Sequence, residues 1–226
     1  DNHCMLGLIL ITVLRALWKK LLLIWLCFLP LVSHAEIEYY EDIHFTEITP
    51  VTPVTNTGKI EVIEVFWYAC SHCFSFEKYI QAWLKTKADD VEYTRVPGVL
   101  SKRWILLAKV YYAARDLGVE EKLTPMLFNH IHLLNNKVNS VAAAEKVFVA
   151  NGVAAKDFRK AIKSFSVNTK IGQAKSLNKK YGIKGVPALI IDGRYRIDSG
   201  SIGSFEKVID IANFLIKKAR TERTTQ

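Results

Sequence analysis

Two cysteines separated by two residues are the side chains of this sequence best suited to chemistry. Cys70 and Cys73 enclose Ser71 and His72 and follow an apolar run rich in β-branched and aromatic residues. An amphipathic pattern with helical spacing begins directly after them, so we expect the pair where a strand passes into a helix. A cysteine in the first turn of a helix faces unsatisfied N–H groups and the positive end of the helix dipole. Both features stabilise a thiolate, so we expect Cys70 to be reactive.

The first 35 residues resemble a secretory signal peptide. The apolar run Leu21–Val32 follows basic residues and precedes Ser33-His34-Ala35, which has the small-x-small form of a signal-peptidase site. A second apolar stretch, Met5–Ala16, leaves a membrane anchor as the alternative. Neither run reaches the roughly 18 residues that a spanning helix needs. We therefore expect cleavage after Ala35.

Cleavage after Ala35 would leave Cys70 and Cys73 as the only cysteines of the mature chain. An exported protein with one close pair lacks a disulfide scaffold, so the pair is more often reactive than structural. A structural zinc site would need four ligands, and no further cysteine is left to supply them. His130 and His132 are two residues apart, a spacing that points helical side chains in different directions. We expect no bound metal.

The charge of the chain does not indicate a nucleic-acid partner. The formal net charge is +9, and it falls to +7 without residues 1–35, which contain three basic residues and one acidic residue. The other lysines and arginines are interleaved with acids and form no block of basic and aromatic residues. We expect a solvated basic surface.

The elements around the pair predict an α/β protein. Strand patterns at Lys59–Trp67 and Val91–Val96 flank an amphipathic helix at Cys73–Lys87, which makes a right-handed βαβ unit. A polar lead-in with an extended candidate at Ile43–Ile48 precedes this unit. Only helical patterns follow, at Lys102–Leu117, Leu123–Leu134, Val141–Ala150, Ala154–Phe165 and Asn168–Lys180.

Strand patterns return near the end of the chain. Ala188–Ile191 and Tyr195–Ile197 are joined by Asp192-Gly193, a dipeptide favoured in two-residue hairpin turns. An amphipathic helix at Ser204–Lys218 follows, and we expect Ala219–Gln226 to be frayed.

This order of elements is that of a thioredoxin fold with an inserted all-helical domain. We expect a signal peptide at 1–35, a first thioredoxin-like part at 36–98, a helical insert at 99–168 and a second thioredoxin-like part at 169–226.

Two motifs more than a hundred residues apart resemble the DsbA family of periplasmic thiol:disulfide oxidoreductases. They are VIEVFWYACSHCFSFE around the cysteine pair and GIKGVPALIIDGRY near the last strands. The resemblance implies a periplasmic enzyme that introduces disulfide bonds into unfolded or reduced secreted proteins. It also implies reoxidation by a DsbB-like quinone-linked membrane protein and no need for a bound cofactor. We further expect a monomer.

The resemblance assigns roles to the cysteine motif. Cys70 matches the nucleophile, Cys73 the resolving cysteine and His72 the histidine that lowers the pKa of the nucleophile. Val186-Pro187 matches the cis-proline pair that offers backbone groups to a substrate, and an X-Pro bond is the only kind that becomes cis at low cost.

The chain has an acidic residue in its most apolar strand. A buried, unpaired Glu64 would be costly, so it should raise its pKa or find a cation. The resemblance places Glu64 beneath the active site with Arg95 as its basic partner, and we expect Glu64 to assist proton transfer at Cys73. An outward-facing Glu64 in a salt bridge is the alternative. Ser71 departs from the family, whose members often have proline there, so the redox poise stays open.

Two other activities fit parts of the sequence. A disulfide isomerase or reductase could use the same fold, although family isomerases carry an N-terminal dimerisation domain for which residues 36–58 are too short. A redox-inert chaperone module with an apolar peptide groove belongs to a different class. We expect the oxidase.

Overall fold

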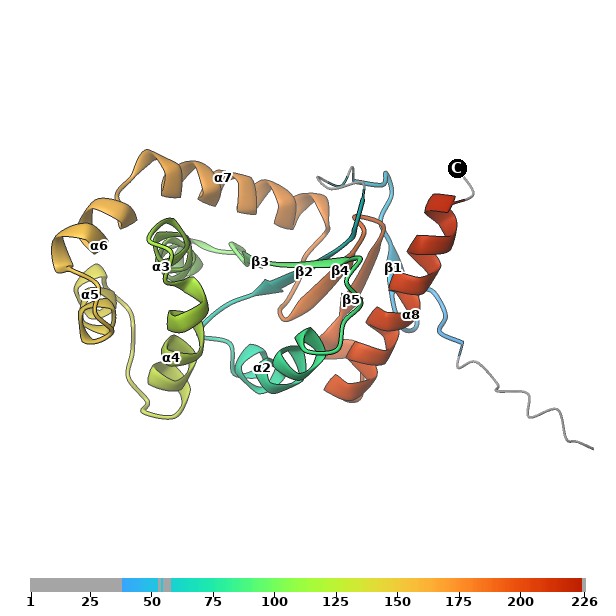
Figure 1. Cartoon of the computed structure of the whole chain (residues 1–226), viewed down its shortest axis with the longest axis horizontal. Coiled ribbons are helices and arrows are strands. Elements are labelled where there is room, and N and C mark those ends of the chain that lie inside the picture. Colours follow the sequence, from blue (N-terminus) through green and yellow to red (C-terminus); the bar gives the residue numbers. More distant parts are fainter. Residues whose placement is uncertain (1–37, 53, 55–57, 225–226) are drawn as a thin grey trace, which may run out of the picture. The chain divides into compact units, whose positions relative to one another are not determined.

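A five-stranded sheet in the order β1-β5-β4-β2-β3 organises the structure (Figure 1). The structure is a computed structural model that describes residues 38–52, 54 and 58–224, so the expected signal peptide at 1–35 lies outside the described residues. The strands are β1 (Thr46–Glu47), β2 (Ile60–Phe66), β3 (Val91–Pro97), β4 (Ala188–Ile191) and β5 (Tyr195–Asp198). β2 and β3 are parallel, and the other neighbouring strands pair antiparallel.

Helices cover both faces of this sheet. α2 (Ser71–Leu84) and α8 (Phe205–Thr224) pack on one face, where Val62 of β2 joins their apolar side chains. On the other face, Ile63 and Val65 of β2 pack with residues at the end of α7 (Phe165–Lys180). Figure 1 shows α7 and α2 on opposite sides of the sheet. Successive side chains of β2 point to opposite faces of the sheet, and helices cover both faces. The side chains on each face must therefore be apolar, which explains the nearly continuous apolar sequence of β2.

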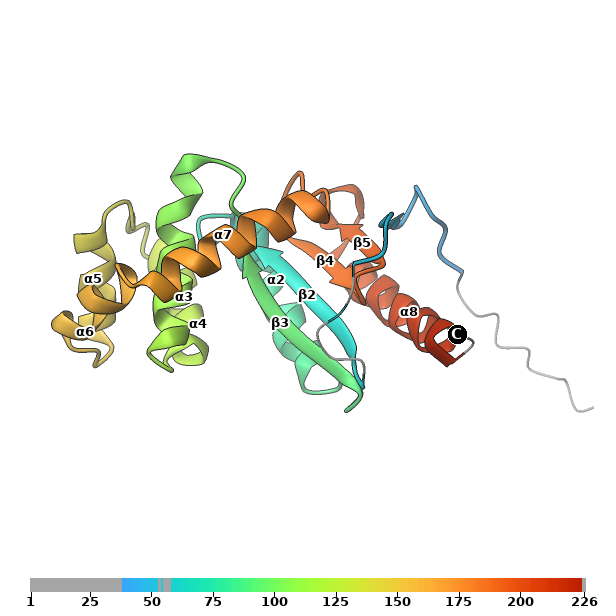
Figure 2. The same cartoon turned by 90° about the horizontal axis from the view of Figure 1, so that it is seen from above.

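The helices that lie between β3 and β4 in the sequence form a second apolar core. They are α3 (Ile105–Asp116), α4 (Glu120–His132), α5 (Val141–Ala150) and α6 (Ala155–Ile162), preceded by a 3₁₀ turn at Lys102–Trp104. Val167 and Ala174 of α7 are buried in this core. Figure 2 shows α7 running from these helices to the sheet. The chain thus has the expected α/β fold with a helical insertion, and α7 joins the insertion to the sheet.

Several element ends differ from the sequence expectations. α7 begins at Phe165 rather than at Asn168, because the Ser164 hydroxyl caps it by accepting the N–H of Val167 at 3.1 Å. The hairpin loop between β4 and β5 has three residues rather than two, since Ile191 pairs with Tyr195.

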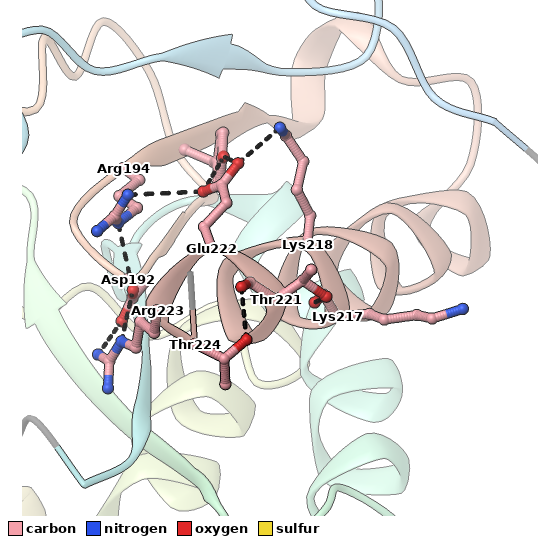
Figure 3. A network of polar contacts seen from close by, with 9 residues as sticks. Asp192, Arg194, Lys217, Lys218, Thr221, Glu222, Arg223 and Thr224 are labelled. Carbon is pink, nitrogen blue, oxygen red and sulfur yellow. Dashed lines mark hydrogen bonds and ion pairs between the residues drawn. The ribbon is translucent and has the colours of Figure 1, made fainter. Parts of the chain in front are cut away.

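The C-terminal helix is longer than expected. We expected frayed chain from Ala219, but α8 continues to Thr224. Its last turns are held by polar side chains of the β4–β5 hairpin, as Figure 3 shows. Arg223 donates through Nε and Nη2 to the buried carboxylate of Asp192, and the Tyr195 hydroxyl donates to Glu222 at 2.7 Å. The sequence separation of about 30 residues hides these contacts from any local pattern.

Candidate active site

The structure places Cys70 at the junction of β2 and α2, as its N-cap. Its backbone is extended, with φ −88° and ψ 117°, and its sulfur accepts the N–H of Cys73 at 3.4 Å. Both cysteines are free thiols, and Cys70 is partly exposed whereas Cys73 is completely buried. Ser71 and His72 form the exposed start of the helix. One sulfur is thus open to a protein substrate and the other is shielded.

The environment shifts the pKa values of the two thiols in opposite directions. The pKa of Cys70 falls from 9.0 to about 6, through a hydrogen bond with the Cys73 thiol, the backbone N–H groups of Cys73 and His72 and the charge of His72. Burial raises the pKa of Cys73 well above 9.0, and the neighbouring Cys70 and the charge of Glu64 raise it further. Opposite shifts in adjacent groups separate a nucleophile from a proton-holding partner.

The Val186-Pro187 segment lies directly against this pair. Its peptide bond is cis, and the Cys70 thiol donates to the Val186 carbonyl at 3.4 Å. The Pro187 carbonyl accepts the N–H and hydroxyl of Ser199, which fixes the segment to the end of β5. Val186 and His72 also line a cavity of about 330 Å³. The fold therefore brings together the two motifs that the sequence keeps more than a hundred residues apart.

Glu64 lies inside the protein beneath the cysteines. Its exposed fraction is 1%, and register places it opposite Arg95, whose Nε donates to Oε2 at 2.8 Å. The Tyr93 hydroxyl donates to the same oxygen, and Oε1 is buried without a partner among the described residues. Glu64 thus faces inward with a cation on the neighbouring strand.

A second carboxylate, Glu77 of α2, joins this cluster. Arg95 Nη2 donates to Glu77 Oε2 at 2.6 Å, so one guanidinium bridges two acids. Burial raises the pKa of Glu77, and the charge of Glu64 raises it further, while Arg95 opposes both effects. Glu77 and Arg95 line a cavity of about 530 Å³. Glu77 was not predicted as a site residue, although its place one helical turn after Cys73 on the same face was a usable signal.

The contacts of two more buried or partly buried polar residues, His132 and Asn178, were not predicted from the sequence. His132 Nε2 lies 2.7 Å from the Tyr68 carbonyl, and its ring stacks on Phe74 at 5.0 Å, so it contacts both sides of the cysteine motif. Asn178 is buried in α7, where its Oδ1 accepts the N–H of Val99 at 2.6 Å. No local pattern marks either residue, because both contacts join segments more than 60 residues apart.

The rest of the described chain adds no metal centre and no membrane span. Within residues 38–52, 54 and 58–224, no group of three or more His, Cys, Asp or Glu side chains could hold a metal ion. In the same part of the chain, no helix is both long and apolar enough to cross a membrane.

This fold and site define a thiol:disulfide oxidoreductase with a thioredoxin fold. A model of the DSBA-like thioredoxin domain matches residues 87–210. The thiol:disulfide interchange protein DsbA of Pseudomonas syringae pv. tomato is 38% identical over 176 residues, which cover 78% of this chain and 82% of the relative. The DsbA of Burkholderia cepacia is 36% identical over 166 residues, which cover 74% of this chain and 78% of the relative.

Solved structures agree with the sequence relatives. The crystal structure of Pseudomonas aeruginosa DsbA superposes with a TM-score of 0.78 at 31% identity and covers 82% of this chain and 97% of its own. The crystal structure of DsbA from Xylella fastidiosa superposes with a TM-score of 0.74 at 28% identity and covers 79% of this chain and 96% of its own. The chain belongs to the DsbA family.

The reduced protein should show an acidic thiol. We expect the thiolate absorbance of Cys70 to rise with pH around a pKa of about 6 rather than 9.0. His72→Ala should raise this pKa, because it removes a positive charge but keeps the backbone N–H. His130→Ala, a change on α4, is the matched control and should leave the titration unchanged. A wild-type pKa near 9 would contradict this account of the site.

Proposed function

We propose that this protein is a disulfide oxidase that transfers the Cys70–Cys73 disulfide to reduced or unfolded secreted proteins. The depressed pKa of Cys70 carries the proposal. A stabilised thiolate favours the reduced form of the protein, and a pair whose reduced form is favoured oxidises other thiols. A reductase would need a pair with less tendency to accept electrons.

The exchange runs in two steps. A substrate thiolate attacks the Cys70 sulfur, the Cys70–Cys73 bond breaks, and Cys73 leaves as a thiolate that takes up a proton. A second substrate thiolate then attacks the substrate sulfur of the mixed disulfide, and Cys70 leaves as a thiolate. Two electrons pass from the substrate dithiol to the protein. The partial exposure of Cys70 and the complete burial of Cys73 support this division of roles.

Val186 and Pro187 would hold the substrate during the first step. An extended peptide beside an open backbone segment pairs through main-chain hydrogen bonds, without regard to most side chains. The 3.4 Å contact between the Cys70 sulfur and the Val186 carbonyl supports this role, because it puts the segment within reach of a chain bonded to Cys70.

Glu64, held by Arg95, would accept and return the proton of the Cys73 thiol. The charge of Glu64 acts on the Cys73 thiol, and the bridge through Arg95 to Glu77 connects the buried carboxylate with a cavity. A carboxylate in this position accepts the proton when Cys73 attacks a mixed disulfide and returns it when Cys73 leaves. His72 would lower the pKa of Cys70, and Ser71 would influence the redox potential of the pair.

Membership of the family supports a proposal for the cellular setting. We place the protein in the periplasm after removal of residues 1–35, as a monomer that a DsbB-like quinone-linked membrane protein reoxidises. Residues 36–98 and 169–226 would form the thioredoxin-like part, and residues 99–168 the helical insert. The name of the relatives, thiol:disulfide interchange protein, supports the reaction class.

Replacing the resolving cysteine should trap the reaction. Cys73→Ser should accumulate mixed disulfides between Cys70 and reduced secreted proteins, because no internal thiol can release them. Cys70→Ser is the matched control and should trap far less, since the remaining thiol is buried. Non-reducing electrophoresis of the exported fraction measures both. A Cys73→Ser variant without mixed disulfides would refute exchange through Cys70.

A single isosteric substitution tests the proton role of Glu64. If Glu64 accepts the proton, Glu64→Gln should slow the attack of Cys73 on a Cys70–glutathione mixed disulfide by about tenfold or more and flatten its pH dependence. If Glu64 acts only by its charge, the same change lowers the pKa of Cys73 and speeds this step. Stopped-flow closure rates distinguish the two, with Glu145→Gln in α5 as the control.

A further inference from the structure

A groove beside Cys70 is lined by apolar and basic side chains that have no role in the proposed exchange reaction. It lies on the side of the inserted helices and has a volume of about 460 Å³. Trp67, Ala69, Leu107 and Ile131 give it an apolar floor, and Ala69 is the residue before Cys70. We call it the Trp67 groove.

The floor of the Trp67 groove is firmly built. The Trp67 ring stacks on the Trp104 ring with centroids 4.4 Å apart and planes 11° from parallel. Trp104 in turn packs against Gly98, where a Cβ atom would lie 2.7 Å from the Trp104 ring and 3.3 Å from Cγ1 of Val186. The floor therefore continues across Trp104 and Gly98 to Val186, the residue proposed to hold a substrate backbone.

The rim of the Trp67 groove is basic. Lys102, Arg103 and Lys137 line it and are exposed, and no acidic residue lines it. In the part of the chain that the structure describes, none of these three cations forms an ion pair, although most other arginines near the sheet do. The Arg103 guanidinium lies 5.9 Å from the centre of the Trp67 ring. Unpaired cations above an aromatic floor suit a carboxylate next to an apolar side chain.

We propose that the Trp67 groove binds the part of a substrate protein next to its reacting cysteine, where an aromatic or long apolar side chain stands beside Asp or Glu. This rests on the proposed function. A substrate bonded to Cys70 is tethered within a few residues of the groove, so even weak contacts are occupied at a high effective concentration. A second copy of this chain is a poor occupant, because its positive net charge, +7 without residues 1–35, repels the rim.

The consequence is a substrate preference set outside the cysteine motif. Backbone pairing at Val186 accepts most sequences, whereas the Trp67 groove would favour acidic and aromatic neighbours of the cysteine. Such contacts act on the first encounter and on the lifetime of the mixed disulfide. Because the rim is exposed, its effect should weaken as salt is added.

Two cysteine peptides that differ only in charge test this proposal. Each carries Phe on both sides of one cysteine, flanked by Glu in one peptide and by Lys in the other. We expect the oxidised wild-type protein to react roughly tenfold faster with the Glu peptide at low salt, because the exposed rim attracts two Glu residues in one peptide and repels two Lys residues in the other. Replacing Phe by Ala in the Glu peptide should lower its rate.

Two matched triple variants locate the preference. Lys102→Glu, Arg103→Glu and Lys137→Glu together should abolish or reverse the ratio of the two rates. Lys146→Glu, Lys156→Glu and Lys160→Glu change the net charge equally, but they lie on exposed positions of α5 and α6 outside the groove, so most of the ratio should remain.

Three outcomes would overturn the proposal. Equal loss of the ratio in both triple variants would show a general field effect and no groove. A wild-type ratio near one, in a protein that still exchanges with dithiothreitol, would remove the groove and leave the proposed function intact. Failure to exchange with dithiothreitol would remove the proposed function, and the groove proposal with it.

Discussion

The position of one sulfur atom at a helix N-terminus governs this site. Cys70 is the N-cap of α2, and its sulfur accepts the N–H of Cys73 that would otherwise lack a partner. The interaction needs a helix that starts at a fixed point, and β2 supplies that point because it is buried on both faces and pairs with β3 and β4. The sheet and the helix core hold the sulfur beside the Cys73 thiol and the backbone N–H groups of Cys73 and His72, and hydrogen bonds with these groups lower the pKa of Cys70.

A buried charge cluster adds a second constraint. Glu64, Arg95 and Glu77 place two carboxylates around one guanidinium below the buried thiol. An isolated charge at this depth would be strongly destabilising, so the carboxylates and the guanidinium depend on each other. Burial raises the pKa of Cys73 most, and the neighbouring Cys70 and the charge of Glu64 raise it further, so the thiol is favoured over the thiolate. The cap and the cluster thus act on adjacent sulfurs in opposite senses.

The sequence predicted those parts of this arrangement that depend on local pattern. The apolar run of β2 and the helical spacing after it located the strand-to-helix junction, and Glu64 stood out as an acid in an apolar strand. The helical insertion was visible as five amphipathic stretches without strand patterns. These signals work because burial and capping act over a few residues.

Contacts between distant segments were not predictable in this way. Asn178 of α7 binds the backbone that follows β3, and His132 of α4 binds the backbone before Cys70, but nothing in their sequence neighbourhood marks them as polar anchors. The last turns of α8 look like a frayed end until Asp192 is seen to bind Arg223. Element ends and positioning residues are set by tertiary partners, whose choice a single sequence does not display.

The redox potential of the Cys70–Cys73 pair tests the central claim most directly. Equilibration with glutathione buffers at neutral pH, with the oxidised fraction read after acid quenching and thiol alkylation, gives this potential. Stabilisation of the Cys70 thiolate at the helix N-terminus predicts a value well above the roughly −270 mV of thioredoxin. A potential at or below that of thioredoxin would show that the reduced form is not favoured, and would contradict the account.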